Sequence, residues 1–358
     1  RLVGSEMCIR DRVGAMLTEF YDWRYVFYMN VPFGLVAFFS ILVTLPAAHT
    51  LGQKMDWLGV IALIVAVSCL QLVLDRGERL GWFSSSEIII NTILSATAFY
   101  IFVVHCLTTE APYITLKMLT DRNYVIGLFL IFTFGIAVFS SLFILPLFLQ
   151  NIQGYPVLSA GWVISSRGLG TMFAMMCSGF LLSMISGKYL ILLGLICVGV
   201  SNVWMTQWTA DVNMQEVIYI TIVNGFGMGM MWVALTTVTF STLEPIYRVE
   251  AASLFSLIRA IGASMGTSVV VSILVRSTQA NYIEMRAQIT EFRSTLNSIV
   301  SGQPFDLKSM ADLRNLETIV MIEAQMVAFL NDFVFLVVIA FGAIPFVFLL
   351  RGRTKKTN

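Results

Sequence analysis

Residues 23–34 read Trp-Arg-Tyr-Val-Phe-Tyr-Met-Asn-Val-Pro-Phe-Gly and stand at the mouth of a long apolar run. The aromatic rings in this stretch are amphipathic and suit the depth of lipid headgroups, where Arg24 can contact phosphate. Asn30 and Pro32 are then predicted to open a helix whose interior is residues 33–45. We therefore expect a membrane-interface segment followed by a spanning helix. Taken alone, the pattern also suits an anchor at the start of an unrelated span.

The composition of the chain places it in a bilayer. Of its 358 residues, 58% are hydrophobic and 12% are charged, with a mean hydropathy of +0.83. Soluble proteins carry about 25% charged residues. A helix that crosses the hydrocarbon core needs about 20 apolar residues and satisfies its own backbone groups. An all-α membrane protein is therefore predicted, with spanning helices at 26–46, 57–75, 87–107, 124–150, 158–183, 188–208, 216–240, 251–275 and 329–350.

The distribution of Lys and Arg predicts the orientation of these helices. If the run 26–46 ends in the cytoplasm, nine basic residues fall on cytoplasmic segments and three on short outer loops. Cytoplasmic loops of membrane proteins carry the excess of Lys and Arg. We therefore expect that orientation.

A second sequence motif is more specific than the first. Residues 74–77 read Leu-Asp-Arg-Gly and residues 82–85 read Trp-Phe-Ser-Ser. Locally they describe a solvated turn with a serine cap before a helix. Together with Trp-Arg-x-x-Phe-x-x-Asn-x-Pro-x-Gly, they resemble the fourteen-span drug:proton antiporter branch of the major facilitator superfamily, the EmrB/QacA type. The residues that carry the family motifs are Gly14, Trp23, Arg24, Asn30, Pro32 and Gly34.

The resemblance covers nearly all of residues 13–350. It implies the C-terminal part of the major facilitator fold, with about nine transmembrane helices plus the tail of a tenth. Residues 13–123 would hold the end of the fifth span, the sixth span and two extra spans. Residues 124–350 would form a six-helix bundle, and 351–358 a basic cytoplasmic tail. Residues 1–12 resemble a translated sequencing adaptor, so we expect an N-terminally truncated fragment.

Residues 276–328 form the longest hydrophilic stretch of the chain. Charged residues alternate there with apolar ones at helical spacing, and the pattern breaks at Gly302-Gln303-Pro304. We expect an outer, amphipathic helical loop before the last span. A solvated loop and a docking surface for a periplasmic partner both remain open.

Charged residues inside spans are candidates for function because they are expensive to bury in a bilayer. Arg167 lies one to two turns inside its run, and Arg259 lies near the inner end of the eighth run. Either side chain can snorkel to the membrane surface. The alternative is a cation that faces a central cavity, where it contacts substrate or holds the bundle in one state.

Three weaker candidates for a functional site have uncharged side chains. Asn202, Asn224 and Trp232 are candidates for lining a substrate cavity, although hydrogen bonds between helices and simple packing are the more frequent roles of such residues. Small residues four apart let helices approach closely, as rocking bundles require. The pairs are Gly225 with Gly229 and Gly262 with Gly266.

Acidic residues are missing from the middle of all nine predicted runs. Asp75, Glu87, Glu216, Glu250 and Asp332 all lie near the ends of runs. A proton-coupled pump needs an intramembrane carboxylate or its equivalent. The resemblance places the usual acid in the first span and a basic partner in the fourth, so the coupling residues are expected outside this chain.

Other functions find no support in the sequence. The cysteines lack metal-ligand or disulfide spacing, and they suit packing in apolar spans. Catalytic sets and basic stripes for nucleic acid are not evident either. We therefore expect no enzyme, no metal, no cofactor and no nucleic-acid partner.

The resemblance implies proton-coupled efflux of small hydrophobic drugs or toxic compounds by alternating access. It places the protein in the bacterial inner membrane, with a periplasmic adaptor and an outer-membrane channel as partners. Two alternatives remain open: an exporter of one metabolite, such as a siderophore or fatty acid, and a non-transporting membrane scaffold or sensor.

Overall fold

The computed structural model describes residues 16–18, 22, 24–44, 56–109, 113–288 and 310–350. The described residues are helical and contain no strand, which confirms the predicted all-α fold. Short 3-10 helices lie at Trp82–Ser84, Leu116–Thr120 and Pro245–Tyr247. The long helices are α2 (Arg24–Thr44), α3 (Trp57–Arg76), α4 (Ser86–Thr108), α5 (Arg122–Asn151), α6 (Val157–Met184), α7 (Gly187–Met205), α8 (Met214–Thr239), α9 (Arg248–Gln288) and α11 (Met310–Phe348).

A long helix covers each of the nine apolar runs. Within the described residues, eight of these helices are long and apolar enough to cross a membrane; the exception is α6, which carries Ser165, Ser166 and Arg167. The helices begin where capping groups are available. Asp121, for example, accepts a hydrogen bond from the backbone N–H of Tyr124 and so satisfies a donor at the start of α5.

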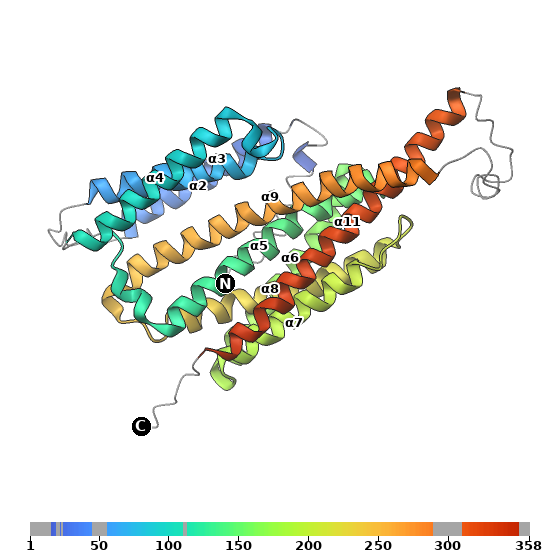
Figure 1. Ribbon diagram of the computed structural model, residues 1–358. Coiled ribbons are helices and arrows are strands. Elements are labelled where there is room, and N and C mark those ends of the chain that lie inside the picture. The colour runs from blue at the N-terminus through green and yellow to red at the C-terminus, as the bar shows by residue number, and fades with distance from the viewer. Residues whose placement is uncertain are drawn as a thin grey trace.

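Six helices form a bundle in which α9, α5, α8 and α6 stand in a row. Contacts join α9 to α5, α5 to α8 and α8 to α6. Helices α7 and α11 cover one side of this row, because α7 packs on α8, and α11 packs on α5, α7 and α9. Figure 1 shows α11 crossing in front of α5 and α8. We call the end at which α5 begins the lower end of the bundle, and the opposite end the upper end.

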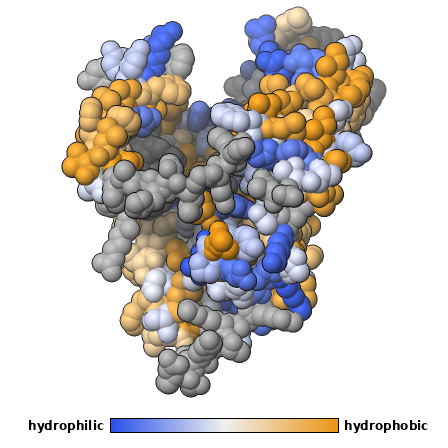
Figure 2. All heavy atoms as spheres, turned by 90° about the vertical axis from the view of Figure 1, so that its left-hand side faces the viewer, coloured by the Kyte–Doolittle hydropathy of each residue, from blue (hydrophilic) through white to orange (hydrophobic). Residues whose placement is uncertain are grey.

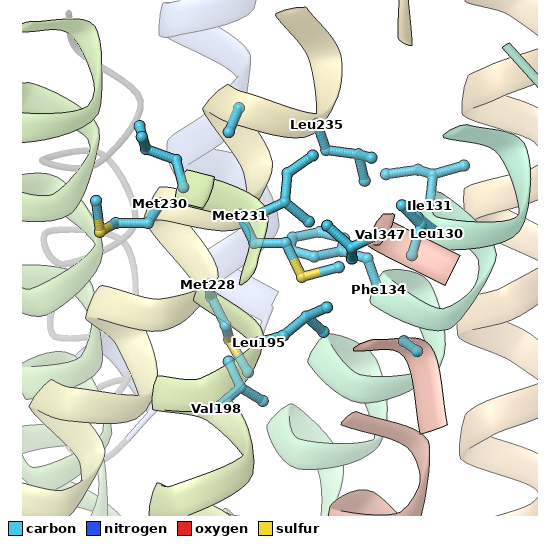
Figure 3. Packing of buried hydrophobic residues seen from close by; sticks show 14 of the residues in the cluster. Leu130, Ile131, Phe134, Leu195, Val198, Met228, Met230, Met231, Leu235 and Val347 are labelled. Atoms are coloured by element: carbon cyan, nitrogen blue, oxygen red, sulfur yellow. The ribbon is translucent and has the colours of Figure 1, made fainter. Parts of the chain in front are cut away.

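The core of the bundle has two layers. The lower layer joins α5, α7, α8 and α11, and in Figure 3 Leu130, Phe134, Leu195, Met231 and Val347 converge there. The upper layer is rich in aromatic rings, among them Phe148, Trp208, Phe329 and Phe333. Each layer fixes the same helices at a different depth, so the bundle is held along its whole length.

Glycines let several helices touch at their backbones. A Cβ at Gly225 of α8 would collide with the carbonyl oxygen of Arg167 on α6. One at Gly229 would lie 2.6 Å from the carbonyl oxygen of Thr171. Glycines on α9 approach α5 in the same way: a Cβ at Gly262 would meet the carbonyl of Phe132, and one at Gly266 would lie 2.7 Å from Cα of Ile136.

Helices α3 and α4 form a hairpin that packs on α9, and α2 stands apart from the core. The hairpin is held together in part by the hydroxyl of Ser95, which donates to the carbonyl of Ala66 across 2.8 Å. None of the residues of α2 is buried. Apolar residues cover large areas of both upper arms of the surface in Figure 2, as expected for helices that face lipid.

Three boundaries differ from the sequence prediction. Helix α2 begins at Arg24, so Asn30 and Pro32 lie inside it and do not open it. A proline in a membrane helix removes one backbone bond and leaves the others intact. The predicted loop 276–328 is largely the continuation of two helices, since α9 reaches Gln288 and α11 begins at Met310. Their amphipathic spacing allows both helices to continue past the apolar core; residues 289–309 lie outside the described part.

Candidate functional site

Arg259 and Trp232, two of the candidates for a substrate cavity, lie close together in the structure. The guanidinium carbon of Arg259 on α9 lies 5.7 Å from the ring centroid of Trp232 on α8 and 6.0 Å from that of Phe139 on α5. These distances are within the range of cation–π attraction. The three side chains come from three neighbouring helices of the row, and the arginine is half-buried among them.

Phe134 completes this cluster from beneath. Its ring lies 5.5 Å from that of Trp232, centroid to centroid, and it belongs to the lower core layer. Trp232 is therefore wedged between the core and the arginine. We call Arg259, Trp232, Phe139 and Phe134 the arginine–aromatic cluster.

Arg167, the second predicted cation, is buried on α6 with 6% of its surface exposed. Its Nη2 donates to the hydroxyl of Ser141 on α5 over 2.8 Å. Arg167 therefore turns inward to a neighbouring helix, and its burial does not fit a side chain that snorkels to the membrane surface. Ser141 lies two residues beyond Phe139, so both arginines reach α5 at nearly the same depth.

The predicted asparagines make contacts elsewhere in the bundle. Asn224 on α8 donates to the hydroxyl of Ser201 on α7 across 2.8 Å. Asn202 donates to the carbonyl of Val198 in its own helix across 2.7 Å. Both side chains are buried, and their bonds point to α7 or stay within it. The structure does not bring them to the arginine–aromatic cluster.

The family-motif residues that the structure describes near the start of the chain are exposed. Arg24 pairs with Asp22, with Nη1 and Oδ2 3.2 Å apart, and Asn30 donates to the carbonyl of Val26. Both are exposed, as are Pro32 and Gly34. Gly14 and Trp23 lie outside the described residues.

Sequence reasoning missed one acidic residue. Asp332 was predicted to lie near the end of a run, but it is in the interior of α11 and has 0% of its surface exposed. The error follows from the start of that helix, which lies at Met310 and not at residue 329. The helical spacing of residues 313–328 was the signal that α11 begins earlier.

Cavities in the described residues are small in the core and larger at the surface. The void between α5, α7, α8 and α11 measures only about 10 Å³. Ligand pockets for drug-sized molecules are about 300–1,000 Å³. Two grooves of about 580 Å³ lie at the upper end, one beside Trp82 and Arg276, the other beside Trp204 and Glu216.

Metal chemistry finds no candidate here: no group of three or more His, Cys, Asp or Glu that could hold a metal ion occurs among the residues that the structure describes. The cysteines at 69, 106, 177 and 197 are unbridged.

The fold and this cluster define a multi-pass helical membrane protein with a cationic, aromatic site between packed helices. Residues 12–267 match the profile of the Major Facilitator Superfamily. This match covers more than half of the chain, which therefore belongs to that superfamily.

Relatives of the chain are named for export or for resistance. The multidrug export protein EmrB of Escherichia coli (strain K12) is 28% identical over 292 residues, which cover 81% of this chain and 57% of that protein. The fatty acid resistance protein FarB of Neisseria gonorrhoeae is 27% identical over 288 residues, 80% and 57% of the two chains. The multidrug resistance protein 3 of Bacillus subtilis (strain 168) is 28% identical over 267 residues, 74% and 52%. The chain thus spans little more than half the length of these curated relatives.

Proposed function

We propose that this chain is part of an exporter that moves small hydrophobic toxic compounds out of a bacterial cell across the inner membrane, in exchange for protons. The observation that carries the proposal is the arginine–aromatic cluster, in which three helices of the row hold a cation against two rings. Relatives named a multidrug export protein and a multidrug resistance protein support it. Membership in a transporter superfamily favours transport over enzyme activity.

The physical role of the cluster is to present a cation and aromatic faces at one place. Arg259 remains half-buried because the rings of Trp232 and Phe139 replace part of its hydration. Aromatic and apolar surfaces bind hydrophobic compounds with little geometric demand, and the guanidinium adds attraction for an aromatic or anionic group. We infer that substrate contacts this cluster when the bundle faces the other half of the transporter.

Alternating access requires bundles that move as units. Close contacts at Gly225, Gly229, Gly262 and Gly266 support such movement, because backbones that touch leave little freedom within the bundle. The rocking of two such bundles about a shared site is the general scheme of these transporters.

A second candidate function is export of one metabolite that carries a carboxylate, such as a fatty acid. A relative named for fatty acid resistance matches as much of the chain as the multidrug exporters do. A single cation beside apolar rings suits an amphipathic anion as well. We also propose that α9 and α11, which extend past the core at the upper end, meet a periplasmic adaptor that leads to an outer-membrane channel.

The test uses the longest reading frame that contains this chain, expressed in a bacterium that lacks its own efflux pumps. We expect resistance to several unrelated hydrophobic toxins, lost when the pH gradient is collapsed. Arg259→Met should lower that resistance about tenfold, since a half-buried cation–π contact is worth roughly 1.4 kcal/mol. Arg248→Met, an exposed arginine at the start of the same helix, is the matched control and should leave resistance unchanged.

Each result separates the candidates. Resistance to a fatty acid alone would replace the multidrug proposal with a dedicated exporter. Resistance to nothing, with protein present in the membrane, would remove both and favour a non-transporting scaffold.

A further inference from the structure

The carboxylate of Asp332 lies in the upper core layer of the bundle. Its neighbours in α11, Phe329 and Phe333, both pack against Phe148 of α5, with ring centroids 5.7 and 6.2 Å apart. Asp332 itself is fully buried. A carboxyl group thus stands among apolar side chains in the interior of α11.

Neither oxygen of Asp332 has a hydrogen-bond partner among the residues that the structure describes. Burying an ionised carboxylate without a partner is very costly in an apolar medium, and such a group takes up a proton instead. The neutral carboxylic acid is therefore the form that fits this packing. A purely structural residue at this position would be apolar or paired.

No counter-charge compensates Asp332 from the three helices packed on α11, as far as they are described. On α9 the charged residue at this depth is Arg276, which bonds to Glu78 on the other side. On α11 itself Glu323 lies nine residues away and is exposed. The titratable groups at the lower ends of α5 and α7 are Arg122, Tyr124, Lys188 and Tyr189. Cys197 of α7 points to α8. In the upper loops lie Tyr155, which borders the upper core layer, and Asp211.

A polar pair between α11 and α9 includes the residue that precedes Asp332 in sequence. The groove beside Trp82 and Arg276 is also lined by Ser277 of α9. The hydroxyl of Ser277 accepts a hydrogen bond from Asn331 across 2.7 Å, and Asn331 is exposed and adjacent to Asp332 in sequence. An exposed polar residue thus adjoins the buried acid in sequence and contacts a residue that lines the groove.

We propose that Asp332 is a proton-binding site of the bundle. The carboxylate takes one proton from a hydronium ion at the upper end, which leaves water and a neutral carboxylic acid. The acid keeps this proton while α5, α9 and α11 are packed as described, and returns it to water when their contact opens. The use of this proton in transport rests on the proposed function, whereas the binding of the proton does not.

The experiment is an infrared absorption spectrum of the purified protein in lipid nanodiscs, recorded in acidic and in alkaline buffer and compared between wild type and variants. We expect a stretching band of a protonated carboxyl group that persists into alkaline buffer in the wild type and is lost in Asp332→Asn. Glu323→Gln removes an exposed carboxyl from the same helix and should keep the band. Asp332→Glu retains a buried carboxyl and should shift the band without removing it, which covers the case in which Asp332→Asn does not fold.

A wild-type spectrum without this band would overturn the proposal, as would a band that persists unchanged in both variants of Asp332. Efflux is measured separately on the same proteins. A protein that shows the band but exports nothing would contradict the proposed function and leave the proton site standing. A protein that exports but lacks the band would contradict the proton site alone.

Discussion

Helices α2 and α8 have comparable apolar compositions, but their environments differ completely. Both are long and apolar enough to span a bilayer. No residue of α2 is buried, whereas 61% of the most apolar stretch of α8 is buried against α5, α6 and α7. Apolar character therefore predicts that both helices enter the membrane, because lipid and protein core are equally apolar solvents. It does not predict which helix packs against another.

The two helices differ in what surrounds their glycines. Gly225 of α8 lies against the backbone of α6, while no atom lies within 4 Å of where a Cβ at Gly34 of α2 would stand. Helix association in a membrane depends on close van der Waals packing of small residues. The bundle has such contacts at several depths, and the described part of α2 has none.

The largest expected effect is the difference in stability between alanine substitutions at these two glycines. Gly225→Ala places a Cβ against the carbonyl of Arg167, which is backbone and cannot move away cheaply. We expect a loss of about 3 kcal/mol, the upper range for overpacked cores, with a matching fall in the thermal midpoint. Gly34→Ala adds a methyl group in open space and should be neutral or stabilise by up to about 1 kcal/mol through helix propensity.

Thermal unfolding followed by the fluorescence of a thiol-reactive dye measures both variants in the same detergent. Equal midpoints for the two variants would show that the contact between α6 and α8 is not the tight one described here. The comparison of the two helices would then have to rest on side chains alone.

An intermediate effect should appear at the α3–α4 hairpin, which is held by fewer contacts than the bundle. Asp56 caps α3 by accepting from the N–H of Gly59 at 3.0 Å, and its Oδ1 lies 2.8 Å from Nε2 of His105. Burial raises the pKa of Asp56, but hydrogen bonds from Gly59, His105 and Tyr113 outweigh it, so the pKa is lowered from 3.8. Asp56→Ala should cost about 1 kcal/mol, as for other helix caps.

The pH dependence of this contribution follows from its sign. Because the pKa of Asp56 is lower in the folded protein, its contribution is complete above the unfolded value of 3.8 and is lost as the pH falls through the folded value. Acid titration of the thermal midpoint should therefore be shallower in Asp56→Ala than in wild type. A steeper titration in the variant would reverse the assignment.

The smallest effect is expected where the hairpin meets α9. Glu78 accepts from the indole of Trp82 at 2.7 Å and from Nε of Arg276 at 3.2 Å. Burial raises the pKa of Glu78, and the hydrogen bonds from Trp82 and Arg276 lower it by more. Arg276 is 65% exposed, so the ion pair is screened by water. Glu78→Gln should change stability by less than about 1 kcal/mol.

Hydrogen exchange of the 77–85 segment, compared between Glu78→Gln and wild type, measures this contact directly. A faster exchange confined to that segment is expected. Faster exchange throughout α9 would mean that the hairpin supports the bundle more than its burial indicates.

Much of the fold could be predicted because each membrane-spanning helix must satisfy its own backbone hydrogen bonds. Each of the nine apolar runs lies mostly in one of the long helices of the described residues, and Asp121 caps the start of α5. The ends of α9 and α11 could not be predicted in the same way, because their charged, amphipathic turns lie outside the apolar core. That boundary concealed the burial of Asp332.

The sequence by itself determined that this is a multi-pass helical membrane protein of the Major Facilitator Superfamily. Composition and run length suffice for the spanning helices, since the bilayer acts on each helix separately. The superfamily follows from the motifs at 23–34 and 74–85 and from the profile match. Only the tertiary structure decided that Arg259 meets Trp232, that Arg167 meets Ser141, and that Asp332 has no described partner. These relations join residues that are far apart in the chain or depend on what surrounds them, and they are set by the packing of helices, which the hydropathy of single helices does not specify.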